Sequence, residues 1–273
     1  LGKRFYSFRH QVCTPKFNGF ANEWIDKPDA EEAVANVLKD ITIRHALEDC
    51  IDIPENVVRT VYTTLSPIIR KNYETLAAES VLYTKQGTIN AVNAGARVKK
   101  LLQLLTGAVY DQEGNVLKVH DERYELIMDL VEVRKHSLVA FNWKHERDQL
   151  IKKAEKRGIT YAVIDGDVAP SKRKDIVDRF QNGHFQVLFA HPQSASHGLT
   201  LTKGTSAIWS SPTYNAEHFQ QFNRRIHRAG QNYKTETILV TARNTWEENV
   251  YSKLNTKMGR MENLLHVLCE LSN

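Results

Sequence analysis

The sequence contains only three cysteines among its 273 residues, and they follow no disulfide or metal-ligand pattern. Cys13, Cys50 and Cys269 lie far apart, and no CxxC pair occurs. These features exclude a disulfide framework and indicate no zinc site, so we expect no bound structural metal. Such cysteine usage is typical of a reducing compartment, and we expect a cytoplasmic protein.

Long apolar runs are also missing. No stretch approaches the roughly 18 apolar residues that a membrane-spanning helix needs, and the opening LGKRFYSFRH lacks the apolar centre of a secretory signal. We therefore expect no membrane partner. Because the sequence begins with Leu1 and not with Met, we expect it to be a piece of a longer protein.

The third absence concerns phosphate binding. The chain has no GxxxxGK[ST] phosphate loop and no Asp-Glu pair at the end of an expected strand. These are the residues that hold the β-phosphate and Mg²⁺ in phosphate-loop enzymes. We expect that this chain cannot hydrolyse a nucleotide by itself.

What is present is ordinary globular composition, with 41% hydrophobic and 25% charged residues. The length allows one large domain or two smaller ones. A formal net charge of +5 is compatible with a nucleic-acid partner but does not require one.

Hydrophobic periodicity predicts an α/β fold. Residues 1–40 show no sustained period and are expected to be irregular apart from a short helix near residues 29–40. A strand is expected over residues 55–65. Helices are expected over residues 66–80 and 89–106, followed by a loop or small hairpin around Gly114. From residue 121 onward, helices alternate with apolar strands near residues 137–141, 160–165, 186–191, 206–211 and 235–242. This alternation predicts a parallel sheet with helices on both faces, which is a RecA-like arrangement.

Thr245 and Glu248 predict a capping box that opens a long C-terminal amphipathic helix, with Gly259 as a candidate break.

The stretch QFNRRIHRAGQ, residues 221–231, is the most informative part of the chain. With Asn215 as N-cap and Gly230 as a stop, residues 216–229 are expected to form one helix. Helical spacing places Gln221, Arg225 and Arg228 on a face opposite the apolar residues. Two guanidiniums one turn apart suit phosphate oxygens. A solvated basic face is the alternative for such a helix taken alone.

The spacing of Gln221, Arg225, His227-Arg228 and Gly230-Gln231 resembles the last helicase motif of the Swi/Snf family. These are DNA-dependent ATPases of helicase superfamily two, built from two RecA-like lobes. Upstream, residues 40–66 resemble the segment that leaves the first lobe, with a strand around Arg44 and a turn at Ile53-Pro54.

Three further stretches match the family in the same order. VAFNWKHERDQL resembles its fourth motif, and IDGDVAPSKRKDIVDRF resembles a segment with an Asp-Gly pair followed by an arginine. AHPQSASHGLTLT resembles the fifth motif, with three departures: His191 replaces the usual Ser, Ser194-Ala195-Ser196 replaces Ala-Gly-Gly, and further on Tyr214 replaces Trp. These departures affect contact details on a loop that approaches nucleotide and DNA.

The resemblance implies a role for each matching residue. Arg225 and Arg228 would be arginine fingers, with Gln221 beside them as a third catalytic residue; Gly198 and Thr200 would join the two arginines in nucleotide binding. The residues implied in DNA contact are Asn142, Trp143, Lys144, Gly166, Arg173, His191 and Thr202. We expect His227 to be a structural hydrogen-bonding group, because phosphoryl transfer needs positioned charge more than a base.

The resemblance also implies the organisation of the chain: residues 1–60 as the tail of the first lobe and a linker, 61–120 as a helical connecting segment, 121–244 as the helicase C-terminal lobe, and 245–273 as a brace helix. ATP and Mg²⁺ would be held mainly by the missing first lobe, with duplex DNA as the other partner. The compact layout predicts a bacterial or phage origin. We also expect a monomer. A strand-separating helicase lobe and a non-catalytic DNA- or protein-binding module remain as alternatives.

Overall fold

The structure is a computed structural model that describes residues 5–17, 19, 21–42, 50–84, 87–111, 113–195 and 198–272, with side chains described up to residue 264. The chain divides into two compact units, one made of residues 1–51 and 255–273 and the other of residues 52–254. Helix α11 (Trp246–Ser272) supplies residues to both. The expected strand around Arg44 lies outside the described residues.

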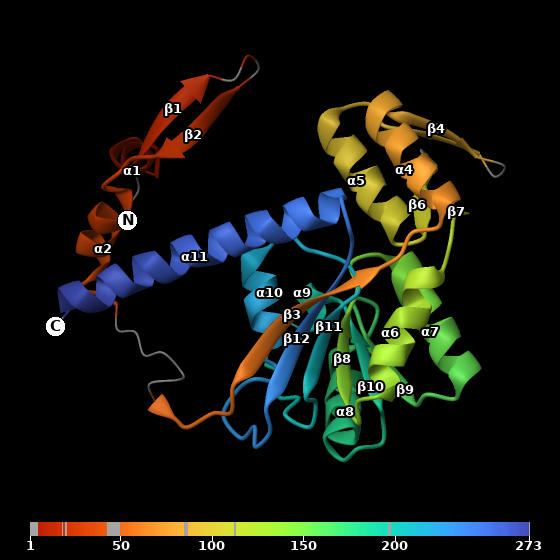
Figure 1. The fold of residues 1–273 in the computed structure, drawn as a ribbon. Coiled ribbons are helices and arrows are strands. Elements are labelled where there is room, and N and C mark those ends of the chain that lie inside the picture. The colour runs from red at the N-terminus through yellow and green to blue at the C-terminus, as the bar shows by residue number, and fades with distance from the viewer. Residues whose placement is uncertain are drawn as a thin grey trace. The chain divides into compact units, whose positions relative to one another are not determined.

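The larger unit is built on a six-stranded sheet whose order is β3-β12-β11-β8-β10-β9 (Figure 1). Every neighbouring pair is parallel. The strands are β3 (Asn56–Thr63), β8 (Ser137–Ala140), β9 (Tyr161–Ile164), β10 (Val187–Ala190), β11 (Ser206–Trp209) and β12 (Thr235–Ala242). The expected boundary at residue 60 falls inside β3, which forms the edge of this sheet.

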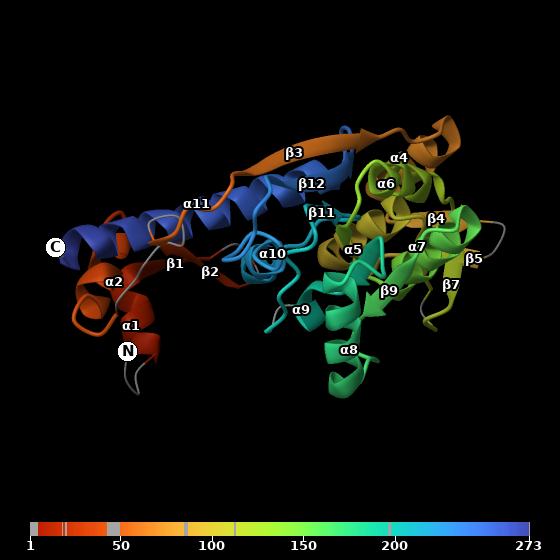
Figure 2. The ribbon, with the colours of Figure 1, turned by 90° about the horizontal axis from the view of Figure 1, so that it is seen from below.

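Helices cover both faces of the sheet, as the alternation of strands and helices predicts. Seen along the strands, α6 (Glu122–Glu132) and α7 (Lys144–Arg157) lie on one side (Figure 2). On the other side lie α8 (Pro170–Gln181), α9 (Pro192–Ala195) and α10 (Ala216–Asn223). The parallel sheet with two helical layers has the RecA-like architecture.

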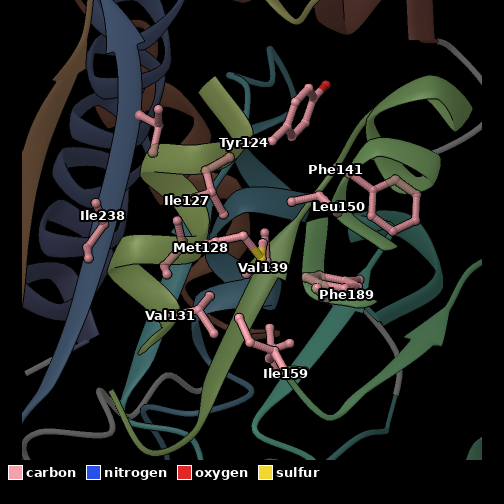
Figure 3. Close-up of a cluster of buried hydrophobic side chains, with 14 residues drawn as sticks. Tyr124, Ile127, Met128, Val131, Val139, Phe141, Leu150, Ile159, Phe189 and Ile238 are labelled. Carbon is pink, nitrogen blue, oxygen red and sulfur yellow. The ribbon is translucent and has the colours of Figure 1, made fainter. Parts of the chain in front are cut away.

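Successive strand residues point to opposite faces, so each face has its own core. Side chains of α6 and α7 pack against Val139, Phe189 and Ile238 of the strands (Figure 3). On the other face, the fully buried indole of Trp209 meets the ring of Phe222 with centroids 5.0 Å apart. Burial on both faces explains why the central strands β8, β10 and β11 consist mostly of apolar residues.

Between β3 and α6 the chain forms a small layer of its own. It contains α4 (Pro67–Glu79), the hairpin of β4 (Val81–Thr84) and β5 (Gly87–Asn90), α5 (Ala94–Leu105), and the hairpin of β6 (Ala108–Tyr110) and β7 (Val116–Lys118). The two helices and the second hairpin were expected; the first hairpin was not. Gly107 is required where α5 turns into β6, because its φ is +94° and a Cβ there would collide with the carbonyl oxygen of His120.

The smaller unit contains α1 (Phe5–Val12), β1 (Cys13–Phe17), β2 (Asn22–Asp26) and α2 (Ala30–Leu38). Helix α2 agrees with the sequence, but the expectation of irregular structure before it was wrong. Strands β1 and β2 form an antiparallel hairpin, and Arg9 lies 3.9 Å from the ring centroid of Trp24. Most residues of both strands are exposed, so no apolar alternation marks them in the sequence.

Helix α11 begins as expected, although its cap uses shifted partners. The Thr245 hydroxyl accepts from the backbone N–H of Glu247, and the Glu248 carboxylate accepts from the N–H of Asn244. The helix continues through Gly259 to Ser272 without a break. One long helix therefore replaces the alternative of two short ones.

Candidate nucleotide and nucleic-acid site

Five of the seven residues expected to contact DNA follow the carboxyl ends of three neighbouring strands. In a parallel sheet these ends meet at one edge. Asn142, Trp143 and Lys144 follow β8, Gly166 follows β9, and His191 follows β10. All five line a single cavity of about 310 Å³, together with Phe141, Asp165, Asp167, Gln193 and Ser194. The structure thus brings together residues that lie up to 49 positions apart in the sequence.

The charges around this cavity balance one another. Arg147 donates to the Asp165 carboxylate at 2.7 Å, and Lys144 lies 3.8 Å from Asp167. Burial by itself would raise the pKa of Asp165, but the hydrogen bond from Arg147 holds that pKa below its ordinary value. Sequence reasoning missed the role of Arg147. In the sequence, Arg147 lies on the first turn of an expected helix, directly before Asp148. That position does not predict an ion pair with Asp165, which lies 18 residues away.

The loop after β8 is held rigidly. The Asn142 side-chain amide donates to the Ser211 hydroxyl at 2.8 Å and to the carbonyls of Ser211 and Pro212. Buried Glu146 accepts from the N–H groups of Asn142 and Trp143. The indole of Trp143 stacks on the imidazole of His145, with centroids 5.9 Å apart and planes 8° from parallel. Asn142 therefore uses its donors to join two loops, whereas Trp143 presents a fixed aromatic plane.

Two of the expected DNA-contacting residues do not line the cavity. Arg173 donates to the backbone carbonyls of Asp165 and Val168, each at 3.0 Å. The hydroxyl of Thr202 accepts from Gln181 at 3.1 Å. In this conformation Arg173 braces the loop that carries Gly166. Of the departures from the family pattern, Ser196 lies outside the described residues.

Helix α10 is shorter than expected. It ends at Asn223, so Arg225 and Arg228 lie in a series of turns and not on a helix. The expected helix over residues 216–229 is wrong because the backbone carbonyls that would continue it have other partners. The carbonyl of Arg225 accepts from the N–H of Leu201, and that of Ile226 accepts from the Gln231 side chain.

The two arginines nevertheless lie together. The guanidinium of Arg225 donates to the carbonyl oxygen of Leu199 at 3.2 Å, and that of Arg228 donates to the same oxygen at 3.1 Å. Burial and the neighbouring Arg228 charge lower the pKa of Arg225 from its ordinary value. Gly198, with φ of +68°, sets the turn before Leu199. Thus the arginine segment directly contacts the loop that includes Gly198 and Thr200.

Gln221 lies at the start of this arrangement. Its backbone carbonyl accepts from Nε of Arg225 at 2.9 Å, and its side-chain nitrogen donates to Glu217. Among the residues that the structure describes, the buried Oε1 atom of Gln221 has no hydrogen-bond partner. His227 is buried, with Nε2 3.0 Å from the Pro54 carbonyl, which is the kind of contact expected of a structural histidine.

A second cavity of about 630 Å³ was not anticipated. Asn142 and Trp143 line it as well, together with residues of α5, the loop after β11 and the start of α11. Lys99 and Lys253 are the charged side chains among its lining residues.

Within the described ranges, no group of three or more His, Cys, Asp or Glu side chains could hold a metal ion. Nor does any helix in those ranges have the length and apolar character needed to cross a membrane.

The sequence is similar to a known protein family and to several known proteins. Residues 122–230 match the model of the helicase conserved C-terminal domain. The chain is 29% identical to protein p41 of Acyrthosiphon pisum secondary endosymbiont phage 1 over 240 residues, covering 85% of this chain and 50% of p41. It is 26% identical to the human DNA repair and recombination protein RAD54B over 151 residues, covering 55% of this chain and 16% of RAD54B.

The fold is also found among solved structures. The C-terminal part of the Fun30 ATPase domain aligns with a TM-score of 0.57 at 12% identity, covering 74% of this chain and 90% of that one. The chain spans half the length of the phage relative and a smaller share of RAD54B.

Proposed function

Residues 122–230 match the model of the helicase conserved C-terminal domain, and we propose that this chain is the second lobe of a Swi/Snf-type protein, which completes the ATP site of a DNA-dependent ATPase that moves along duplex DNA. A first lobe with the phosphate loop would hold most of the ATP and its Mg²⁺. This lobe would supply Arg225 and Arg228 to the γ-phosphate, with Gln221 beside them.

The observation that carries the proposal is the convergence of two guanidiniums on one oxygen. Arg225 and Arg228 both donate to the Leu199 carbonyl, which bears only a partial negative charge. A phosphate oxygen bears more charge and forms stronger hydrogen bonds with guanidinium groups. The same two donors therefore fit a phosphoryl group that replaces the carbonyl, and positioned positive charge is what phosphoryl transfer requires.

Gln221 supports this assignment. Its orphaned Oε1 atom is buried, and leaving a buried acceptor without a donor costs free energy. A donor that reaches this atom when the two lobes close would satisfy it, while the Gln221 backbone carbonyl orients Arg225. Gly198 and Thr200 belong to the loop on which the arginines rest, which is consistent with a place beside the nucleotide.

For DNA we propose backbone contacts along the loops that line the 310 Å³ cavity. Lys144 is exposed at this cavity, and Trp143 and His191 add polar and aromatic surface. Since Arg147 and Lys144 are balanced by Asp165 and Asp167, binding at this edge should be weak. Contacts to the DNA backbone carry no base information, so base specificity should be low. A protein that travels along DNA needs contacts of that kind.

The test uses the full-length protein that contains this lobe. Arg225→Ala and Arg228→Ala should each lower duplex-stimulated ATP turnover by roughly 10³-fold or more, as loss of an arginine finger does. Arg224→Ala is the matched control, since Arg224 is the adjacent exposed arginine, and it should retain turnover. Normal turnover in both finger variants would reject the proposal.

A strand-displacement assay on the same protein separates duplex translocation from strand separation. We expect no release of a labelled strand from a blunt duplex during ATP hydrolysis. Release of that strand would identify a strand-separating helicase.

A further inference from the structure

Gln231 lies between the arginine segment and the loop of residues 198–204. Its side chain is buried, with 5% exposed. The amide nitrogen lies 3.0 Å from the carbonyl oxygen of Thr202, 3.1 Å from that of Gly204 and 3.0 Å from that of Ile226. Its Oε1 atom accepts from the N–H of Tyr233 at 3.0 Å. One side chain thus joins the two segments and the start of the following turn.

These bonds fix the distance between the two segments. An amide nitrogen has two hydrogens, so three acceptors around it leave little freedom for any of the carbonyls. The Leu201 N–H adds a bond to the carbonyl of Arg225 at 2.9 Å. At Gly204 a Cβ would come within 3.0 Å of the Ile226 Cγ2 atom, so the Gly204 backbone lies directly against the Ile226 side chain. Gln231 therefore lies where hydrogen bonds hold the two segments together.

We infer that Gln231 is a positioning residue that fixes Arg225 and Arg228 toward the transferring phosphoryl group. Because the Ile226 carbonyl accepts from the Gln231 amide nitrogen, it leaves the helical pattern between the two arginines. That turn points both guanidiniums at the same Leu199 oxygen. The inference rests on the proposed function, because it assigns Gln231 an effect only through the arginines.

A purely structural role is the competing interpretation, in which these hydrogen bonds stabilise the lobe without directing the arginines. Gln231→Glu separates the two, because it keeps the shape and the acceptor for Tyr233 but removes the donors. Gln231→Met removes the donors without adding charge, and it remains informative where the carboxyl variant does not fold. Gln103→Glu is the matched control, a buried glutamine of α5 that receives the same change.

The measurement is ATP turnover of the full-length protein at saturating duplex DNA. Gln231→Glu and Gln231→Met should lower kcat by roughly 10- to 100-fold, the cost of a displacement of about 1 Å in a catalytic group. The KM for ATP should change less than threefold, since most ATP contacts lie on the other lobe. Gln103→Glu should retain kcat. A variant whose kcat falls only in proportion to its unfolded fraction would overturn the inference.

A double-mutant cycle then asks whether Gln231 acts through the arginines. In a background that already carries Arg225→Ala and Arg228→Ala, Gln231→Met should cause no further loss of kcat. A loss of equal size in both backgrounds would overturn the positioning role while leaving the arginine fingers intact. If the arginine substitutions themselves leave kcat unchanged, the proposed function fails first, so the two failures are distinguishable.

Discussion

Arg123 of α6 and Glu247 of α11 form an ion pair that is sealed from solvent. Nη2 of Arg123 lies 2.7 Å from Oε2 of Glu247, and both side chains are 0% exposed. Arg123 also donates to the Ser210 carbonyl after β11, and Glu247 accepts from the Ala242 N–H at the end of β12. The pair therefore joins two helices to the carboxyl ends of β11 and β12.

Breaking this pair should destabilise the larger unit. Arg123→Met leaves a buried carboxylate without its cation, which costs about 3 to 5 kcal/mol. Arg123→Met combined with Glu247→Gln should recover part of that loss, because no lone charge remains and the Ala242 N–H keeps an acceptor. Arg59→Ala, which removes a largely exposed partner of Glu236, should cost under ~1 kcal/mol. Urea unfolding measures all three, and equal costs for Arg123→Met and Arg59→Ala would contradict the assignment.

Stability should fall as the solution is acidified below pH 6.5. Burial lowers the pKa of His145 from 6.5 to about 4, and its ring nitrogens lie within hydrogen-bond distance of Thr106 and Tyr110. Between these two pH values the unfolded imidazole binds a proton that the folded one does not, so acid favours the unfolded state. The full difference is about 3 kcal/mol at 1.36 kcal/mol per pKa unit.

The measurement is the free energy of unfolding in urea at pH 8 and at pH 5. His145→Gln should reduce the difference between the two values. Some pH dependence should remain, because burial also lowers the pKa of His120 and of His191. An unchanged difference in the His145→Gln variant would show that this histidine is not the titrating group.

A core substitution near α10 should lower stability more than ATP turnover, whereas a site substitution should lower turnover more than stability. Phe222→Ala removes a fully buried ring that packs on Trp209, and it should cost ~3 kcal/mol or more. Arg228→Ala removes a hydrogen bond to the Leu199 carbonyl and should cost about 1 kcal/mol. Melting temperature and ATP turnover of the two full-length variants provide the contrast. A strongly lowered melting temperature with normal ATP turnover in Arg228→Ala would contradict a catalytic role for Arg228.

The end of α10 shows what periodicity cannot predict. Phe219, Phe222 and Ile226 are all buried, so the apolar pattern that indicated one arc of a helix is real. The helix stops because Leu201 and Gln231 supply hydrogen bonds from elsewhere to the carbonyls of Arg225 and Ile226. Such partners depend on tertiary structure. The parallel sheet was predictable because strands buried on both faces are marked by composition alone.

For the candidate site, the sequence predicted which residues lie at the strand ends but not which partners their neighbours bind. Motif resemblance selected Trp143, Lys144, Gly166 and His191, and they share a cavity because parallel strands end at one edge. It did not reveal that Arg173 is bonded to backbone carbonyls, since a guanidinium in a basic stretch reads as a phosphate ligand. Nor could it reveal Arg147, whose partner Asp165 lies on another strand end.

The isolated 273-residue chain should fold but should not hydrolyse ATP. It contains no phosphate loop and no acidic pair for Mg²⁺, and arginine donors cannot replace those groups. Phosphate release should match a mock preparation both with and without duplex DNA, while thermal unfolding of the same sample should be cooperative. Steady turnover that follows the protein through purification would contradict the half-site assignment.

Binding of the isolated chain to duplex DNA should depend on salt more than on sequence. Lys144 at the cavity and Lys172 on the first turn of α8 are exposed, so both are placed to meet phosphates. Each phosphate contact contributes about 0.9 to the slope of log Kd against log salt concentration. Lys144→Gln and Lys172→Gln should therefore each lower that slope by about 0.9, whereas Lys152→Gln, an exposed control on α7, should leave it unchanged.

Arg173→Gln gives the sharper test of this arrangement. Since Arg173 donates to the carbonyls of Asp165 and Val168, its loss should loosen the loop that carries Gly166 and weaken binding, yet leave the salt slope intact. A slope that falls by about 0.9 in Arg173→Gln would show that this guanidinium leaves the carbonyls and binds a phosphate itself. Duplexes of equal length and shuffled sequence should bind alike, because backbone contacts carry no base information. Strong preference for one sequence would mean that side chains of these loops read base edges.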